Sequence, residues 1–184
     1  KYFKKLGLKT HLQPFEYSIK LNPHDENSST PSKGTNVIGY LDNKAAKTIV
    51  IGAHYDHLGL NQHHQSTLMN SDGQIHNGAD DNASGVSAVM ELARVFAKNK
   101  TQEKVNYVFA LFSAEEDGLI GSKKFAENVK SQYPNVVTMI NMDMVGRLDK
   151  DKNLTVGGVG SSPIFPDLVK KVKPAGYNIT LDES

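Results

Sequence analysis

The chain has 184 residues, a formal net charge of +1 and no cysteine. A chain of this length can bury one substantial core, so we expect a single domain. The near-balanced charge gives no electrostatic reason to expect binding to nucleic acid or to a membrane, and no apolar run approaches the about 20 residues that span a bilayer. The absence of cysteine excludes disulfide bonds and thiolate catalysis, so any metal site must use His, Asp and Glu.

The N-terminal quarter of the chain alternates irregularly between polar and apolar side chains and contains three prolines. This pattern predicts edge strands, antiparallel to each other, around a polar loop at residues 22–34. The next apolar run, at residues 48–51, is short and β-branched, which predicts a buried strand. Apolar side chains then recur at helical spacing over residues 86–97, and Asn82 or Ser84 can cap the start of this helix.

Two further apolar runs, at residues 105–112 and 136–142, predict buried strands, and a second helix is expected between them at residues 119–130. A short strand at residues 154–156 and a helix at residues 165–172 follow. Strands that alternate with helices indicate an α/β protein. We expect a three-layer α/β/α sandwich around a mixed, mainly parallel central sheet, and neither a repeat nor a linker indicates a second domain.

Four polar clusters lie where ligands bind in such folds. Three of them directly follow the predicted buried strands: His54 with Asp56, Glu115 with Glu116, and Asp143. The fourth, Gly78-Ala79-Asp80-Asp81-Asn82, precedes the first long helix. Open α/β sheets bind ligands outside the carboxyl ends of their strands, and acidic groups that converge there repel each other unless cations neutralise them. Imidazole and carboxylate ligands suit zinc, manganese or cobalt, and zinc is the usual choice in hydrolases.

Each cluster alone has a simpler explanation. A His-x-Asp sequence after a strand is more often a hydrogen-bonded pair in a loop, the Asp-Asp-Asn segment can be a turn with a helix cap, and Glu115 and Glu116 can be solvated loop acids. The common position of all four clusters favours the metal site. Among the other histidines, we expect His57 to form a loop hydrogen bond and His63-His64 to lie in a polar surface loop.

The strings GAHYDHLG, NGADDNASG, FSAEEDGLIGS and NMDMVGR occur in this order along the chain. Together they resemble the motifs of the zinc aminopeptidases of peptidase family M28, and the resemblance covers residues 49–147. It implies that His54 and Asp143 bind one zinc ion. It also implies that Asp80 bridges this ion to a second zinc ion, which Glu116 binds.

The resemblance assigns further roles near these ligands. Glu115 is implied to be the general base, and Asp56 to hold the imidazole of His54 in the required tautomer. The peptide bond between Asp80 and Asp81 is implied to be cis. The implied reaction is hydrolysis of the N-terminal peptide bond of a peptide substrate with a free N-terminus, at a site with two zinc ions.

The resemblance also implies a fifth protein ligand, a histidine downstream of Asp143, yet all seven histidines of this chain precede Asp80. We therefore expect one peptidase domain over residues 1–184 that lacks its C-terminal part. The site of His54, Asp80 and Asp143 is then the tighter one, and activity is weak or absent unless another segment completes the second site. A truncated sheet edge would favour self-association. The chain begins with Lys1 rather than Met, and a secreted or periplasmic (cell-envelope) location is expected.

Three other interpretations remain open. Glutaminyl cyclases share the fold with a single zinc ion, carboxypeptidase or dipeptidase relatives differ mainly in their pocket residues, and receptor-like binding modules keep the fold without the ligands. A binding module should show substituted ligand positions. The presence of every expected acid and of His54 favours the hydrolase.

Overall fold

The computed structural model describes residues 1–20, 29–62 and 65–184. These residues form two compact units, Lys1–Val145 and Gly146–Ser184. The expected polar loop falls mostly outside the described residues, as do His63 and His64, and the chain is already in a strand from Ser29. The single domain without a C-terminal part stays a prediction.

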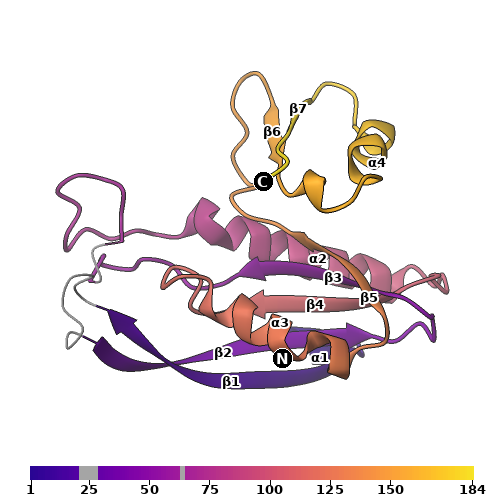
Figure 1. Cartoon of the computed structure of the whole chain (residues 1–184), viewed down its shortest axis with the longest axis horizontal. Helices are drawn as coiled ribbons and strands as arrows, with labels where there is room; N and C mark the ends of the chain where they lie inside the picture. The colour runs from indigo at the N-terminus through magenta and orange to yellow at the C-terminus, as the bar shows by residue number, and fades with distance from the viewer. Residues whose placement is uncertain (21–28, 63–64) are drawn as a thin grey trace. The chain divides into compact units, whose positions relative to one another are not determined.

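A five-stranded mixed sheet forms the centre of the first unit (Figure 1). Its strands lie in the order β1-β2-β4-β3-β5 and have these bounds: β1 Lys9–Lys20, β2 Ser29–Leu41, β3 Thr48–His54, β4 Asn106–Phe112 and β5 Val136–Asn141. β1 pairs with β2, and β2 with β4, in antiparallel fashion, whereas β3 is parallel to both β4 and β5. The mixed α/β fold is thus confirmed, and the three parallel strands present their carboxyl ends at the same edge of the sheet.

Helices pack on both faces of this sheet. They are α1 (Tyr2–Lys5), α2 (Gly85–Lys98) and α3 (Ile120–Gln132). Because neighbouring side chains of a strand point to opposite faces, β4 supplies Phe109 to a core with Val89 of α2 and Val108 to a core with Phe125 of α3. These two cores make the three layers that the sequence predicts.

Strand β5 differs from its prediction as a buried strand. Val137 is 48% exposed, Met139 42% and Ile140 54%. β5 pairs with β3 on one side, and no other described strand pairs with its outer edge. The prediction of burial is wrong because an apolar run is equally compatible with a central strand and with an edge strand that is covered on fewer sides.

The second unit contains two parallel strands, β6 (Asn153–Val156) and β7 (Asn178–Leu181), and the helix α4 (Phe165–Val172). The predicted strand and helix of this region are confirmed, whereas the sequence pattern did not indicate β7. In the described parts of the chain, every helix is too short or too polar to span a membrane. The extracytoplasmic location stays a prediction.

Candidate metal centre

His54 ends β3, an interior strand of the sheet, and its side chain is only 2% exposed. The Nδ1 atom of its ring lies 3.1 Å from the backbone carbonyl oxygen of Asp56. A carbonyl oxygen can only accept a hydrogen bond, so Nδ1 carries the ring proton in the neutral imidazole. The lone pair is therefore on Nε2, the tautomer that a metal ligand needs.

Three carboxylates face this Nε2 atom. A carboxylate oxygen of Asp81 lies 3.0 Å from it, one of Asp143 lies 3.5 Å from it, and one of Glu115 lies 4.0 Å from it. Ligand atoms of His54, Asp81 and Asp143 all lie within 4.8 Å of one another. Ligands at 2.0–2.1 Å from a tetrahedral zinc ion are about 3.3 Å apart, so the donor types and their spacing fit such an ion.

The structure brings Asp81 to this cluster rather than Asp80, the residue predicted from the family resemblance. Among the described residues, Asp80 contributes no atom to the three-residue cluster. The cis peptide bond lies between Asp81 and Asn82, so its prediction between Asp80 and Asp81 is wrong. The backbone of the turn Ala79–Ser84 leaves helical geometry at Asp81 (φ −102°, ψ 92°), which decides which acid of the doublet reaches the cluster.

The two glutamates follow β4 in a tight turn. The carbonyl oxygen of Glu115 accepts hydrogen bonds from the N–H groups of Gly118 and Leu119. The two carboxylate oxygens of Asp56 accept the N–H groups of Glu115 and Glu116, each at 3.2 Å. The same carboxylate is 3.8 Å from Nδ1 of His54, too long for a hydrogen bond. Asp56 therefore holds the histidine ring by its backbone carbonyl and the glutamate turn by its side chain.

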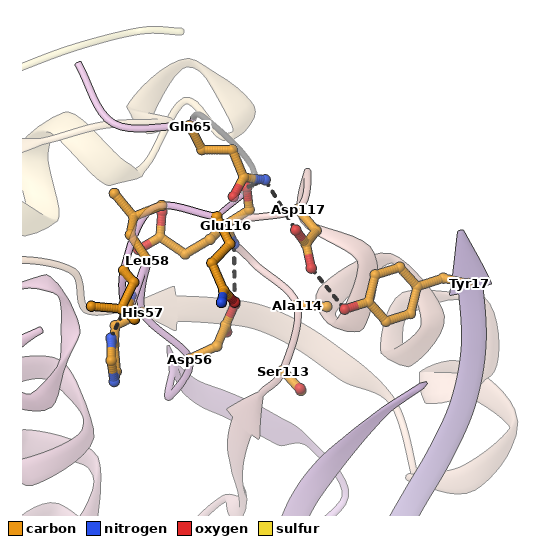
Figure 2. A pocket seen from close by; sticks show the side chains of 12 residues that line it. Tyr17, Asp56, His57, Leu58, Gln65, Ser113, Ala114, Glu116 and Asp117 are labelled. Atoms are coloured by element: carbon orange, nitrogen blue, oxygen red, sulfur yellow. Dashed lines mark hydrogen bonds between the residues drawn. The ribbon is translucent and has the colours of Figure 1, made fainter. Parts of the chain in front are cut away.

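A cavity of about 230 Å³ lies beside this turn, and Glu116 and Asp56 are in its wall (Figure 2). Figure 2 shows Asp117 between Tyr17 of β1 and Gln65. The Tyr17 hydroxyl donates to Asp117 at 2.7 Å. The Gln65 amide donates to Asp117 at 3.0 Å and to the carbonyl oxygen of Glu116 at 2.7 Å. The sequence did not indicate these contacts, because partners so far apart along the chain leave no local pattern.

The predicted loop role of His57 is confirmed. Its Nδ1 atom accepts a hydrogen bond from the N–H group of Gly59 at 2.9 Å. A ring nitrogen used in this way is not free to bind a metal ion. Of the two histidines in the first motif, His54 is the one that belongs to the acidic cluster of the described residues.

The acidic surroundings shift the ionisation of the site. Burial acts to lower the pKa of His54, but the interaction with Asp56 and the charges of neighbouring carboxylates raise the pKa to about 9. Burial and the charges of Asp81 and Glu115 raise the pKa of Glu116 to about 7, and burial also raises the pKa of Glu115. The site thus favours added positive charge, which either protons or metal ions can supply.

The sequence of this chain is similar to those of known proteins. A sequence profile of Peptidase family M28 matches residues 36–183. The chain is 31% identical over 156 residues to Leucine aminopeptidase 1 of Pyrenophora tritici-repentis (strain Pt-1C-BFP). The aligned region covers 83% of the chain and 36% of that protein. It is 44% identical over 78 residues to a probable zinc metalloprotease of Pyrenophora teres f. teres (strain 0-1). This aligned region covers 42% of the chain and 16% of that protein.

Solved structures share the fold at lower identity. A leucine aminopeptidase precursor from Bacteroides thetaiotaomicron VPI-5482 superposes with a TM-score of 0.71 at 23% identity and covers 98% of this chain and 66% of its own. The glutaminyl cyclase of Porphyromonas gingivalis superposes with a TM-score of 0.74 at 18% identity, over 98% of this chain and 65% of its own. The chain thus spans about two thirds of these structures and about a third of the leucine aminopeptidase relative. Because the family profile extends over most of its residues, the chain belongs to peptidase family M28.

Proposed function

We propose that this chain carries the metal centre of a zinc-dependent aminopeptidase that removes the N-terminal residue of peptides. The observation that carries the proposal is the convergence of Nε2 of His54 with the carboxylates of Asp81 and Asp143. Family membership and the names of the relatives, a zinc metalloprotease and a leucine aminopeptidase, support both the metal and the class of reaction.

In this proposal, His54, Asp81 and Asp143 hold one zinc ion, and Asp81 and Glu116 share in holding a second. The charge of Asp81 raises the pKa of Glu116, so a cation near both carboxylates would be electrostatically favourable. Bound zinc would supply Lewis acidity to the peptide carbonyl and lower the pKa of water at the site. The protein's own part is to present these ligands in the correct geometry.

Glu115 serves as the general base in this proposal. Its carboxylate takes a proton from the attacking water and passes it to the nitrogen of the leaving amine, so that the proton count balances. Burial raises the pKa of Glu115, which brings it nearer the operating pH and improves both transfers. Asp56 keeps Glu115 in place through the backbone. The carboxylates of the site would attract the α-ammonium group of a substrate, which supports the proposed preference for a free N-terminus.

The proposal is tested by zinc binding and by hydrolysis. We expect isothermal titration calorimetry of the metal-free chain with Zn²⁺ to show binding that His54→Ala abolishes. His57→Ala is the matched control, because His57 belongs to the same loop but bonds to Gly59, and it should bind zinc as the wild type does. A failure of the wild type to bind zinc would reject the proposal.

The hydrolysis assay uses leucine p-nitroanilide with and without zinc. Because the chain spans only part of its relatives, we expect weak turnover that requires zinc. A glutaminyl peptide is assayed in parallel, and its cyclisation without hydrolysis of the anilide would show that the chemistry is that of a glutaminyl cyclase instead.

A further inference from the structure

The peptide groups around Met142 join the three segments that carry the candidate ligands. The N–H group of Met142 donates to the carbonyl oxygen of Gly52 in β3 at 2.9 Å. Its carbonyl oxygen accepts a hydrogen bond from the side-chain amide of Asn82 at 3.0 Å. Each of these residues lies close in sequence to a candidate ligand. Gly52 is two positions before His54, Met142 directly precedes Asp143, and Asn82 directly follows Asp81.

Ser84 makes a second connection between the same turn and the segment after β5. Its hydroxyl donates to the carbonyl oxygen of Asp80 at 2.6 Å and accepts the N–H group of Val145 at 3.0 Å. Asn82 and Ser84 therefore contact the backbone on both sides of Asp143, at Met142 and at Val145. Both contacts are made to main-chain atoms, so neither depends on a bound ion.

The two segments approach so closely that only glycine fits between them at position 85. A Cβ atom on Gly85 would lie 2.3 Å from the carbonyl oxygen of Met142 and 2.4 Å from Oδ1 of Asn82. Oδ1 of Asn82 also accepts the N–H group of Gly85 at 3.0 Å. Asn82 is only 2% exposed, and its amide thus uses both ends to fasten the turn.

We propose that Asn82 and Ser84 are positioning residues that fix the separation of the Asp81 and Asp143 carboxylates before a cation binds. The inference rests on the proposed metal centre, since it concerns the affinity of that centre for zinc. Two carboxylates near one point repel each other in the empty site. The hydrogen bonds that Asn82 and Ser84 form with the backbone on both sides of Asp143 oppose this repulsion. The ligands are therefore in place before zinc binds, and no binding free energy is used to bring them together.

The test is the zinc affinity of Ser84→Ala, measured by calorimetry on the metal-free 184-residue chain. Loss of a hydrogen-bond partner behind a ligand typically weakens metal affinity about 10- to 100-fold, and we expect at least the lower value. The matched control is Ser87→Ala. Ser87 likewise donates to the carbonyl oxygen four residues earlier, at Ala83, but makes no bond to the Asp143 segment, so we expect a change within about twofold. Ser84→Thr, which keeps the hydroxyl, should restore most of the affinity.

A second measurement separates positioning from a general loss of structure. Far-ultraviolet circular dichroism spectra in EDTA should be alike for Ser84→Ala and Ser87→Ala, whereas the Co²⁺ absorption spectrum should change only for Ser84→Ala. Equal zinc affinities of Ser84→Ala and the wild type would overturn the positioning role while leaving the metal centre intact, as would equal losses in the two alanine variants. Absence of zinc binding by the wild type would instead overturn the metal centre itself. Asn82→Ala, with a larger expected loss of affinity, provides the stronger variant where it folds.

Discussion

Nε2 of His54 lies 3.0 Å from a carboxylate oxygen of Asp81, and this contact joins the end of β3 to the turn before α2. The other ring nitrogen is committed to the carbonyl oxygen of Asp56. The Nε2 atom of the imidazole thus meets negative charge, and the Nδ1 atom is fixed by the backbone. This arrangement makes the centre sensitive both to the identity of the acid and to the protonation of the imidazole.

The first prediction distinguishes the two acids of the Asp80-Asp81 doublet. We expect Asp81→Asn to lower zinc affinity by more than about 100-fold. Removing a ligand should weaken zinc binding more than removing a residue that only supports a ligand. Asp80→Asn, the matched control, removes the same charge one position earlier and should retain most of the affinity. Calorimetric titration with Zn²⁺ measures both. A larger loss in Asp80→Asn would restore the original assignment from the sequence motif.

The second prediction concerns the proposed general base. Glu115→Gln keeps the shape of the side chain but cannot take a proton, so we expect hydrolysis of leucine p-nitroanilide to fall about 10²- to 10⁴-fold. Zinc affinity should change far less, since Glu115 contributes no ligand atom to the described cluster. The measurement is turnover and calorimetry on the same preparation. Full activity of this variant would exclude the assigned role.

The third prediction is the pH dependence of stability without metal. The pKa of His54 is raised from 6.5 to about 9 in the folded protein. A raised pKa stabilises the fold fully below pH 6.5, and this contribution is lost as the pH rises through about 9. We expect the free energy of unfolding in EDTA, measured by urea titration, to fall over this window. His54→Gln should show a flatter profile between these pH values, and an unchanged slope in that variant would contradict the shift.

Glu116 adds a second window at lower pH. Its pKa is raised from 4.5 to about 7. Its contribution to the free energy of unfolding is therefore fully present below pH 4.5 and is lost as the pH rises through about 7. Zinc should reverse the trend, because the ligands bind in their deprotonated forms and metal binding releases protons. Unfolding curves with and without Zn²⁺ should therefore diverge as the pH rises.

The fourth prediction tests the contacts around Asp117. Tyr17→Phe removes the hydroxyl that donates to this carboxylate, and we expect a loss of about 1 kcal/mol in the free energy of unfolding. Tyr177→Phe is the control, since the Tyr177 hydroxyl forms no hydrogen bond with the described residues and its ring faces Lys152. Chemical denaturation compares the two variants. A similar cost for both would mean that the Tyr17 contact contributes nothing specific.

The sequence predicted the sheet, the main helices and the position of the site because these depend on local patterns. Apolar runs marked β3 and β4, helical spacing marked α2, and the polar residues after the strands marked the edge where ligands converge. The choice between Asp80 and Asp81 could not be predicted in this way, since it depends on backbone angles within one turn. The contacts of Asn82 with Met142 and of Tyr17 with Asp117 likewise join segments 60 and 100 positions apart.

The edge position of β5 has a consequence for how the centre opens. β3, which ends in His54, has a hydrogen-bonded neighbour on each side, whereas β5, which leads to Asp143, has one among the described strands. Detaching β5 breaks one hydrogen-bonded ladder, whereas detaching β3 breaks two, so local opening of β5 requires less free energy than that of β3. Amide hydrogen exchange should therefore be faster in β5 than in β3, and zinc should slow it in β5 most. β5 is then more easily opened than β3, and the contacts of Asn82 and Ser84 limit this opening where the chain reaches Asp143.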